Sequence, residues 1–272
     1  MIHEIMAERI LRKQEESDRE WTESHKDRVP RLSISDIGWC RRKAIYGAYK
    51  PYVNHPLHVD VTHPFDEYLL TKFEEGSTME QMTSDGVQEH YKGTSTDVSD
   101  NEPWRHGHWS GRPDLWIVES GRAIIVEHKT TEPQNFRYGN RLPYDHHLYQ
   151  LMGYWILAKR LKLVDLSVDL VLYYRGFGNW AEFDVVPKPG GAIHYYGEVN
   201  GEYKAGTVDY NVEQEMLALE TYFKAEALPE KYDSPFTERF ACTKKNKAGY
   251  WPNCAYFGVC WPGCPQSGPF DP

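Results

Sequence analysis

The spacing of apolar and polar residues along the chain predicts a small α/β domain. Apolar residues recur at helical intervals in four segments, 2–24, 66–91, 143–161 and 211–226. Runs rich in β-branched and aromatic residues predict strands at 109–118, 122–129, 167–175 and 179–186. The order is helix, two or three strands, helix and strand. We therefore expect one α/β core with its chemistry on the central hairpin.

Local signals refine this outline. Residues 1–30 read as a polar helical extension, and 31–272 as the main domain. Within residues 31–50, Ser35 or Asp36 is expected to cap a short helix, and Pro143 is placed as a first-turn residue of the helix 143–161. The tight sequence Glu-Ser-Gly at 119–121 is expected to join the two central strands.

Composition narrows the class of protein. Apolar residues make up 40% of the 272 residues, and no run approaches the about 18 apolar residues of a membrane span. The charged N-terminus lacks a signal-peptide core, which predicts a cytoplasmic protein, or host-cytoplasmic if it is phage-encoded. The net charge of −9 argues against a protein that coats nucleic acid, but bound metal ions can invert the charge of an acidic site, so it does not exclude a nuclease.

Two carboxylates and a lysine form the strongest candidate site. Asp114 stands in a Gly-Arg-Pro-Asp sequence, and Glu127 and Lys129 follow in Glu-His-Lys. Residues two apart on a strand share a face, so Glu127 and Lys129 point together, and a hairpin brings Asp114 to the same side. An exposed strand would make this a solvated ion pair of little worth. The preceding Ala-Ile-Ile-Val predicts a buried strand instead, which favours a Mg²⁺ or Mn²⁺ site for phosphodiester hydrolysis.

These motifs, followed by His-His-Leu-Tyr-Gln-Leu-Met-Gly-Tyr, resemble the RecB-like branch of the PD-(D/E)xK nuclease superfamily. The resemblance implies a restriction-endonuclease-like core, a central mixed sheet flanked by helices. It also implies that Gln150 and Tyr154, four residues apart on one helix face, contact DNA or orient the site. The branch places a further metal ligand, often His, on the preceding helix. Here Glu80 stands at that position, with Glu75 and His90 as competitors.

Five cysteines suggest a second metal centre. One is upstream and the others lie near the C-terminus: Cys40, Cys242, Cys254, Cys260 and Cys264. Their clustering favours metal ligation over core filling. The iron–sulfur subset of the family, which includes AddB-type and CRISPR-adaptation nucleases, joins one upstream Cys to three downstream ones around a [4Fe–4S] cluster. By this resemblance Cys40, Cys254, Cys260 and Cys242 are the ligands, with 240–264 as the cluster-binding tail. Cys264 is the alternative fourth ligand, and Zn²⁺ the alternative metal.

The resemblance implies an exonuclease that degrades DNA ends, single strands above all, in recombination, repair or phage DNA metabolism. Two alternatives stay open: a non-catalytic DNA- or protein-binding module that kept the fold, and a zinc-stapled interaction protein. The sequence contains no phosphate-binding Gly loop, so ATP hydrolysis would come from a partner such as a helicase, a recombinase or another DNA-processing protein. A homo-oligomer is the other assembly considered, and no membrane partner is expected.

Overall fold

The structure is a computed structural model and describes residues 12, 16, 19–20, 23, 29–59, 67–92, 94, 97–99, 103–119, 121–137, 142–163, 167–176, 178–230, 243–246, 249–252 and 256–260. The chain divides into two compact units. One comprises residues 33–38 and 68–218, and the other residues 1–32, 39–67 and 219–272. Most of the predicted helix 2–24 lies outside the described residues, as do Cys242, Cys254 and Cys264.

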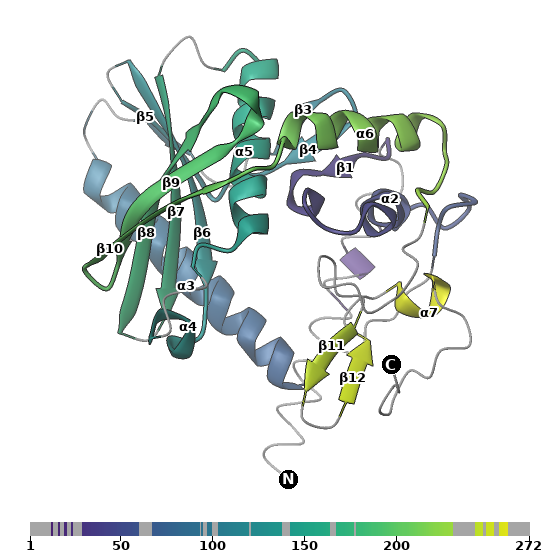
Figure 1. Cartoon of the computed structure of the whole chain (residues 1–272), viewed down its shortest axis with the longest axis horizontal. Helices are drawn as coiled ribbons and strands as arrows, with labels where there is room; N and C mark the ends of the chain where they lie inside the picture. Colours follow the sequence, from purple (N-terminus) through teal and green to yellow (C-terminus); the bar gives the residue numbers. More distant parts are fainter. Residues whose placement is uncertain are drawn as a thin grey trace. The chain divides into compact units, whose positions relative to one another are not determined.

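A seven-stranded mixed sheet forms the centre of the first unit (Figure 1). Its order is β10-β9-β8-β7-β6-β5-β2. The strands in chain order are β2 (Asp97–Ser99), β5 (Leu115–Glu119), β6 (Arg122–Thr130), β7 (Ser167–Gly176), β8 (Asn179–Pro187), β9 (Ile193–Val199) and β10 (Glu202–Val208). The pairing of β6 with β7 is parallel, whereas the other neighbours in this sheet are antiparallel. The predicted α/β class, with a mixed sheet as in restriction-endonuclease-like cores, is therefore confirmed.

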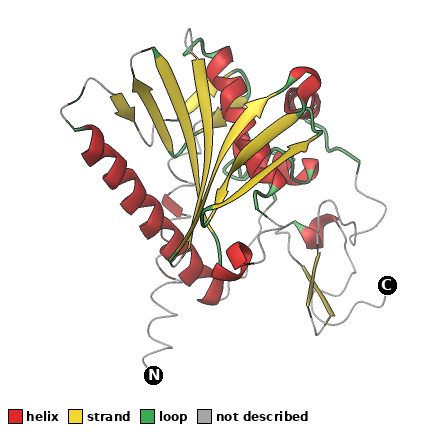
Figure 2. Cartoon of the chain, turned by 60° about the vertical axis from the view of Figure 1, so that its left-hand side comes forward, coloured by secondary structure: helices red, strands yellow, loops and turns green. Residues whose placement is uncertain are grey.

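Two helices cover opposite faces of this sheet (Figure 2). Helix α3 (Glu67–Tyr91) lies on the face of Thr130, because the Cα of its Gly76 comes so close that an added Cβ would be 3.0 Å from the threonine hydroxyl. Helix α5 (Asp145–Arg160) is the crossover between β6 and β7 and lies on the other face. It buries Leu148, Leu151 and Leu157 against the sheet. Parallel strands require such a crossover, which explains why this apolar helix follows β6.

A second, three-stranded sheet has the order β1-β4-β3. It consists of β1 (Leu32–Ser33), β3 (Trp104–His106) and β4 (Trp109–Gly111). The predicted strand 109–118 was therefore wrong as one element: it breaks between β4 and β5, which belong to different sheets. Pro113 lies at this break, and a proline has no N–H to donate to a ladder.

Three further expectations need correction. Ser33, rather than Ser35 or Asp36, caps a 3-10 turn η1 (Ile34–Asp36), and helix α2 (Arg41–Tyr49) begins later. Pro143 follows a cis peptide bond and precedes α5, which starts at Asp145. The hairpin β9–β10 was not predicted, although its Asn200-Gly201 turn is a strong hairpin signal. Two short elements, α4 (Pro133–Arg137) and η2 (Pro189–Gly191), complete the connections of the sheet.

The other unit brings together segments from both ends of the chain. Its elements include α2, β11 (Thr243–Asn246), β12 (Gly249–Pro252) and α7 (Phe257–Cys260), and helix α6 (Val212–Lys224) ends in it. The Tyr46 ring of α2 stacks on Tyr256, which directly precedes α7, at a centroid distance of 5.0 Å. Tyr49 stacks on Phe223 of α6 at 5.4 Å. Tyr46 and Tyr256, which are more than 200 positions apart in the sequence, are thus in direct contact. No helix among the described residues has the length and apolar character that crossing a bilayer requires.

Candidate active site

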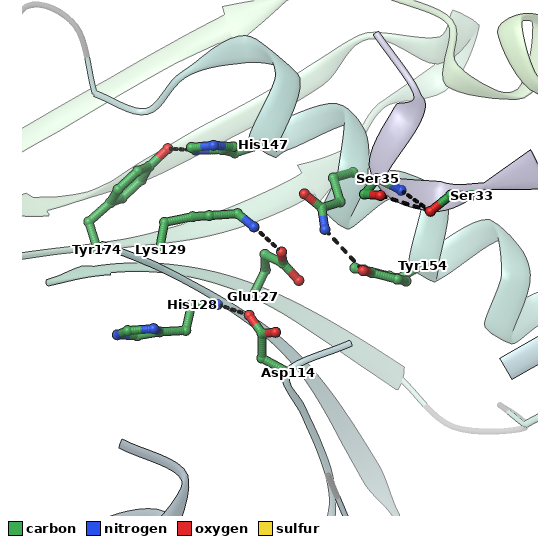
Figure 3. A network of polar contacts seen from close by, with 10 residues as sticks. Ser33, Ser35, Asp114, Glu127, His128, Lys129, His147, Tyr154 and Tyr174 are labelled. Carbon is green, nitrogen blue, oxygen red and sulfur yellow. Dashed lines mark hydrogen bonds and ion pairs between the residues drawn. The ribbon is translucent and has the colours of Figure 1, made fainter. Parts of the chain in front are cut away.

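The β5–β6 hairpin brings the predicted catalytic residues together. The paired register of β5 and β6 ends at Leu115 and Val126, and Asp114 directly precedes β5. The Asp114 carboxylate lies near that of Glu127, because its charge contributes to the raised pKa of Glu127. Asp114 Oδ2 also accepts a hydrogen bond of 2.6 Å from the backbone N–H of His128. Glu127 and Lys129 share this face because they are two residues apart on one strand. The predicted grouping of Asp114, Glu127 and Lys129 therefore exists in the folded chain (Figure 3).

The two carboxylates lie close together in a mostly buried site, beside the ammonium group of Lys129. Glu127 is only 1% exposed; Lys129 Nζ donates to its Oε1, while its Oε2 is buried and has no hydrogen-bond partner. Burial, followed by the neighbouring Asp114 carboxylate, raises the pKa of Glu127 to about 8. Burial likewise raises the pKa of Asp114 to about 6, although Lys129 opposes the shift. Burial alone would lower the pKa of Lys129, but its contact with Glu127 outweighs this and raises it. One lysine does not balance two buried carboxylates.

Gln150 and Tyr154 lie on α5, above the strand that carries Glu127. Gln150 Nε2 donates to the Tyr154 hydroxyl at 3.0 Å, and the two side chains are only 8% and 3% exposed. Burial, then the charge of Glu127, raises the pKa of Tyr154. The Tyr154 ring packs against Gly111, where an added Cβ would lie 2.8 Å from the ring. Of the two predicted roles, this burial favours orientation of the site over contact with DNA.

Glu80 approaches the site from α3. It lines a pocket of about 200 Å³ with Asp114, and its negative charge contributes to the raised pKa values of both Asp114 and Glu127. The competing His90 is exposed near the end of the same helix, against the ring of Tyr91. The side chain of Glu75 lies outside the described residues. Glu80 is thus the α3 candidate that the structure brings to Asp114.

Sequence reasoning missed several residues around the site. The same pocket is lined by His128 and Arg112, together with Ser77, Gln81, Thr83, Ser84 and Leu115. The side chain of His128 points away from Glu127, as the strand alternation predicts, yet it enters this pocket and its buried Nε2 has no hydrogen-bond partner. A lone His or Arg in a sequence carries no signal of such a position.

A second missed pair stands beside Lys129. Tyr174 is the parallel-register partner of Lys129 and is fully buried. Its hydroxyl is 2.8 Å from Nδ1 of His147 and accepts the backbone N–H of Tyr144 at 3.0 Å. Burial, followed by the charges of His146 and Lys129, lowers the pKa of His147 to about 2, so this imidazole is neutral. The signal available in the sequence was that His147 stands three residues before Gln150, on the same face of the helix.

Two of the five cysteines are described. Cys40 precedes α2 and Cys260 ends α7; both are partly buried and neither forms a disulfide. Among the residues that the structure describes, no three His, Cys, Asp or Glu side chains converge closely enough to form a metal site as they stand. The predicted acidic set of Glu80, Asp114 and Glu127 is described in full but does not converge to this extent. Of the predicted cysteine ligands, only Cys40 and Cys260 belong to the described residues.

Comparisons with known proteins give a limited result. No family model matches the sequence, and no curated protein matches it. Among solved structures, the chain is similar to an alkaline exonuclease from Laribacter hongkongensis, with 12% sequence identity and a TM-score of 0.38. The similarity covers 76% of this chain and 93% of that chain. A likeness of this degree does not establish a function, so the function is inferred from the geometry of the site.

Proposed function

We propose that the protein is a metal-dependent deoxyribonuclease of the RecB-like PD-(D/E)xK type, which degrades DNA from its ends and prefers single strands. One observation supports this most strongly. Glu127 is buried with one oxygen held by Lys129, its other oxygen has no hydrogen-bond partner among the described residues, and the charge of a second carboxylate, Asp114, acts on it. Two buried carboxylates close together lower the stability of a folded protein. Binding of a cation would account for their presence.

Carboxylate oxygens are donor atoms of the type that a hard divalent cation prefers, although the three side chains do not yet converge on one point. Asp114 and Glu127 would hold Mg²⁺ or Mn²⁺, and Glu80, on the wall of the same pocket as Asp114, would complete the acidic set. When bound, such an ion polarises a phosphate oxygen and makes water nucleophilic near neutral pH. The ion would also provide the partner that Glu127 Oε2 lacks.

Lys129 would stabilise charge during the reaction, and Gln150 and Tyr154 of α5 would position Glu127. The contact with Glu127 keeps the Lys129 ammonium group charged and directed at the site. In that position it stabilises negative charge as it develops on the phosphate during hydrolysis. Gln150 and Tyr154, joined by their hydrogen bond and packed over Glu127, keep the carboxylate in place.

The nuclease proposal is tested by cleavage of end-labelled single- and double-stranded DNA with Mg²⁺ or Mn²⁺ and, separately, with EDTA. Asp114→Ala and Glu127→Ala should lose cleavage while their circular dichroism stays that of the wild type. Glu198→Ala, which removes an exposed carboxylate on β9, serves as the matched control and should cleave normally. Digestion by clean Glu127→Ala protein at the wild-type rate would refute the assignment. DNA binding by the wild type without cleavage under any metal would identify a non-catalytic binding module instead.

We further propose that a metal centre joins the two ends of the chain, with Cys40, Cys242, Cys254 and Cys260 as ligands. Within the described part, the segments that carry Cys40 and Cys260 are held together by the Tyr46–Tyr256 stack, and both thiols are partly buried and unbridged. Cysteine thiolates suit a [4Fe–4S] cluster, and Zn²⁺ is the alternative occupant.

Metal and sulfide analysis of protein purified without oxygen tests this centre. An iron–sulfur protein should be brown with broad absorption near ~400 nm. Cys40→Ser and Cys260→Ser should each reduce soluble yield, because a metal that links distant segments contributes to folding free energy. Cys264→Ser should be nearly silent if Cys242 is the fourth ligand. One zinc per chain in colourless protein would exclude the iron–sulfur centre, and metal-free protein with replaceable cysteines would exclude any centre.

A further inference from the structure

The β3–β4 hairpin has a local charge opposite to that of the whole chain. Residues 103–113 contain Arg105, Arg112, His106 and His108 with two tryptophans, and no Asp or Glu, whereas the chain as a whole carries −9. Arg105, His106, Gly107 and Arg112 are exposed. An exposed segment that combines arginine with an exposed ring, here that of His106, is suited to nucleic acid, since it offers a cation to phosphates and a ring face to a base.

The hairpin is anchored by the tryptophans on one face and exposes Arg105 on the other. In its register Trp104 pairs with Gly111 and His106 with Trp109, so these four residues share a face. Trp109 is fully buried and Trp104 packs edge to face against Trp116 of β5, with ring centroids 5.2 Å apart. Arg105, opposite Ser110, lies on the other face, and the turn at Gly107 leaves His106 exposed at the tip. The anchored tryptophans therefore fix the position of the exposed arginine and histidine.

The hairpin is connected rigidly to the candidate active site. Strand β4 ends at Gly111, whose Cα lies so close to Ile34 and Tyr154 that an added Cβ would be 2.6 and 2.8 Å from their side chains. Asp114 follows three residues later. Four residues separate Ser110, the partner of Arg105, from Asp114, so the chain between them spans at most roughly 13 Å. That distance corresponds to about four phosphates at the 3.4 Å spacing of one strand of a duplex, and fewer in an extended strand.

We infer that the Trp104–Gly111 hairpin guides single-stranded DNA into the site, an inference that rests on the proposed nuclease function. Arg105 binds a backbone phosphate a few nucleotides from the bond that is cut, and the ring of His106 stacks on a base. Stacking requires a base with an accessible face, which an unpaired strand provides and a duplex interior does not. Because the whole chain has a net charge of −9, a local cationic segment beside the site is expected to favour the entry of the strand there.

Binding of a fluorescein-labelled oligothymidine to Glu127→Gln protein, measured by anisotropy in Mg²⁺ at several salt concentrations, tests the inference. Arg105→Ala in this parent should weaken binding about five- to tenfold and lower the slope of log K against log salt by about 0.7, the value for one phosphate of a single strand. His106→Ala should weaken binding with an unchanged slope, because stacking releases no counterion. Lys188→Ala removes an exposed charge outside the hairpin and should change Kd by less than about twofold.

Each outcome decides a different question. A wild-type protein that neither cuts nor binds DNA refutes the proposed function itself. Cleavage by the wild type together with an unchanged affinity and salt slope in Arg105→Ala refutes only the guide hairpin. A loss that appears with duplex but not with oligothymidine refutes the single-strand assignment. Circular dichroism and melting temperatures of the variants must match the parent, which exposed positions at the hairpin tip allow.

Discussion

Replacing Glu127 by glutamine is expected to stabilise the metal-free protein while it abolishes cleavage. Glu127 is 1% exposed, and its Oε2 has no partner. Burial and the facing Asp114 raise its pKa from 4.5 to about 8. A carboxyl group whose pKa is higher in the folded chain holds its proton longer there than in the unfolded chain. The stability of the metal-free protein therefore falls as pH rises through this window.

The size of the effect follows from the width of that window. Between pH 4.5 and pH 7, at 1.36 kcal/mol for each pH unit, the loss of stability is about 3 kcal/mol. Glutamine has no proton to lose, so the variant lacks this pH dependence. At pH 7 in EDTA the free energy of unfolding of Glu127→Gln should exceed that of the wild type by about 3 kcal/mol, and the difference should shrink toward pH 5.

Urea unfolding, followed by the fluorescence of the nine tryptophans, measures the difference at pH 5, 6 and 7. Mg²⁺ at ten times its Kd should stabilise the wild type by about 1.4 kcal/mol and the variant by less. Glu198→Gln, the exposed control, should change stability by less than about 0.5 kcal/mol. Equal free energies of unfolding for the wild type and Glu127→Gln at pH 7 in EDTA, or a difference that does not vary with pH, would show that burial does not destabilise the charged form of Glu127.

Two further substitutions test the support of the site. Gly111→Ala places a methyl group against Tyr154 and should lower the free energy of unfolding by about 1–3 kcal/mol and lower activity. The control Gly86→Ala adds a methyl group in open space on α3 and should be neutral or stabilising. Equal changes in the free energy of urea unfolding for the two variants would exclude the close contact of Gly111 with Tyr154. Tyr174→Phe removes the hydroxyl next to His147 and should cost about 1–3 kcal/mol. A fall in kcat with little change in KM would show that this pair positions the proposed catalytic residue Lys129. A Tyr174→Phe enzyme with wild-type kcat would leave the pair a purely structural role.

The central hairpin could be predicted because its signals are local. Ala123 to Val126 form an apolar run that only a doubly buried strand explains, and the strand alternation then places Glu127 and Lys129 on one face. The turn at Gly121, with φ of 90°, needs a glycine, and the sequence provides one there. The chemistry of the site thus depends on residues close together in the chain.

The other features of the fold and the site depend on contacts between residues far apart in the sequence, which local patterns do not predict. The break between β4 and β5 depends on Pro113 and on the contact of Gly111 with α5, so an apolar run alone suggested one strand. The entry of His128 into the pocket depends on the placement of α3. The hairpin β9–β10 is different: its Asn200-Gly201 turn has φ values of 50° and 85°, a conformation that these two residue types favour, so here a local signal was present and was missed.

The two neighbours of β6 imply an order of assembly for the site. The antiparallel partner β5 is joined through a tight turn, so Asp114 and Glu127 meet by closing a very short loop. The parallel partner β7 comes only after the whole of α5 has crossed the sheet. Contacts close in sequence form faster than distant ones, so we expect the acidic pair to meet before Gln150 and Tyr154 dock over it. A partly folded chain then has its two carboxylates close together but not yet covered, and the complete site forms only when α5 packs on the sheet.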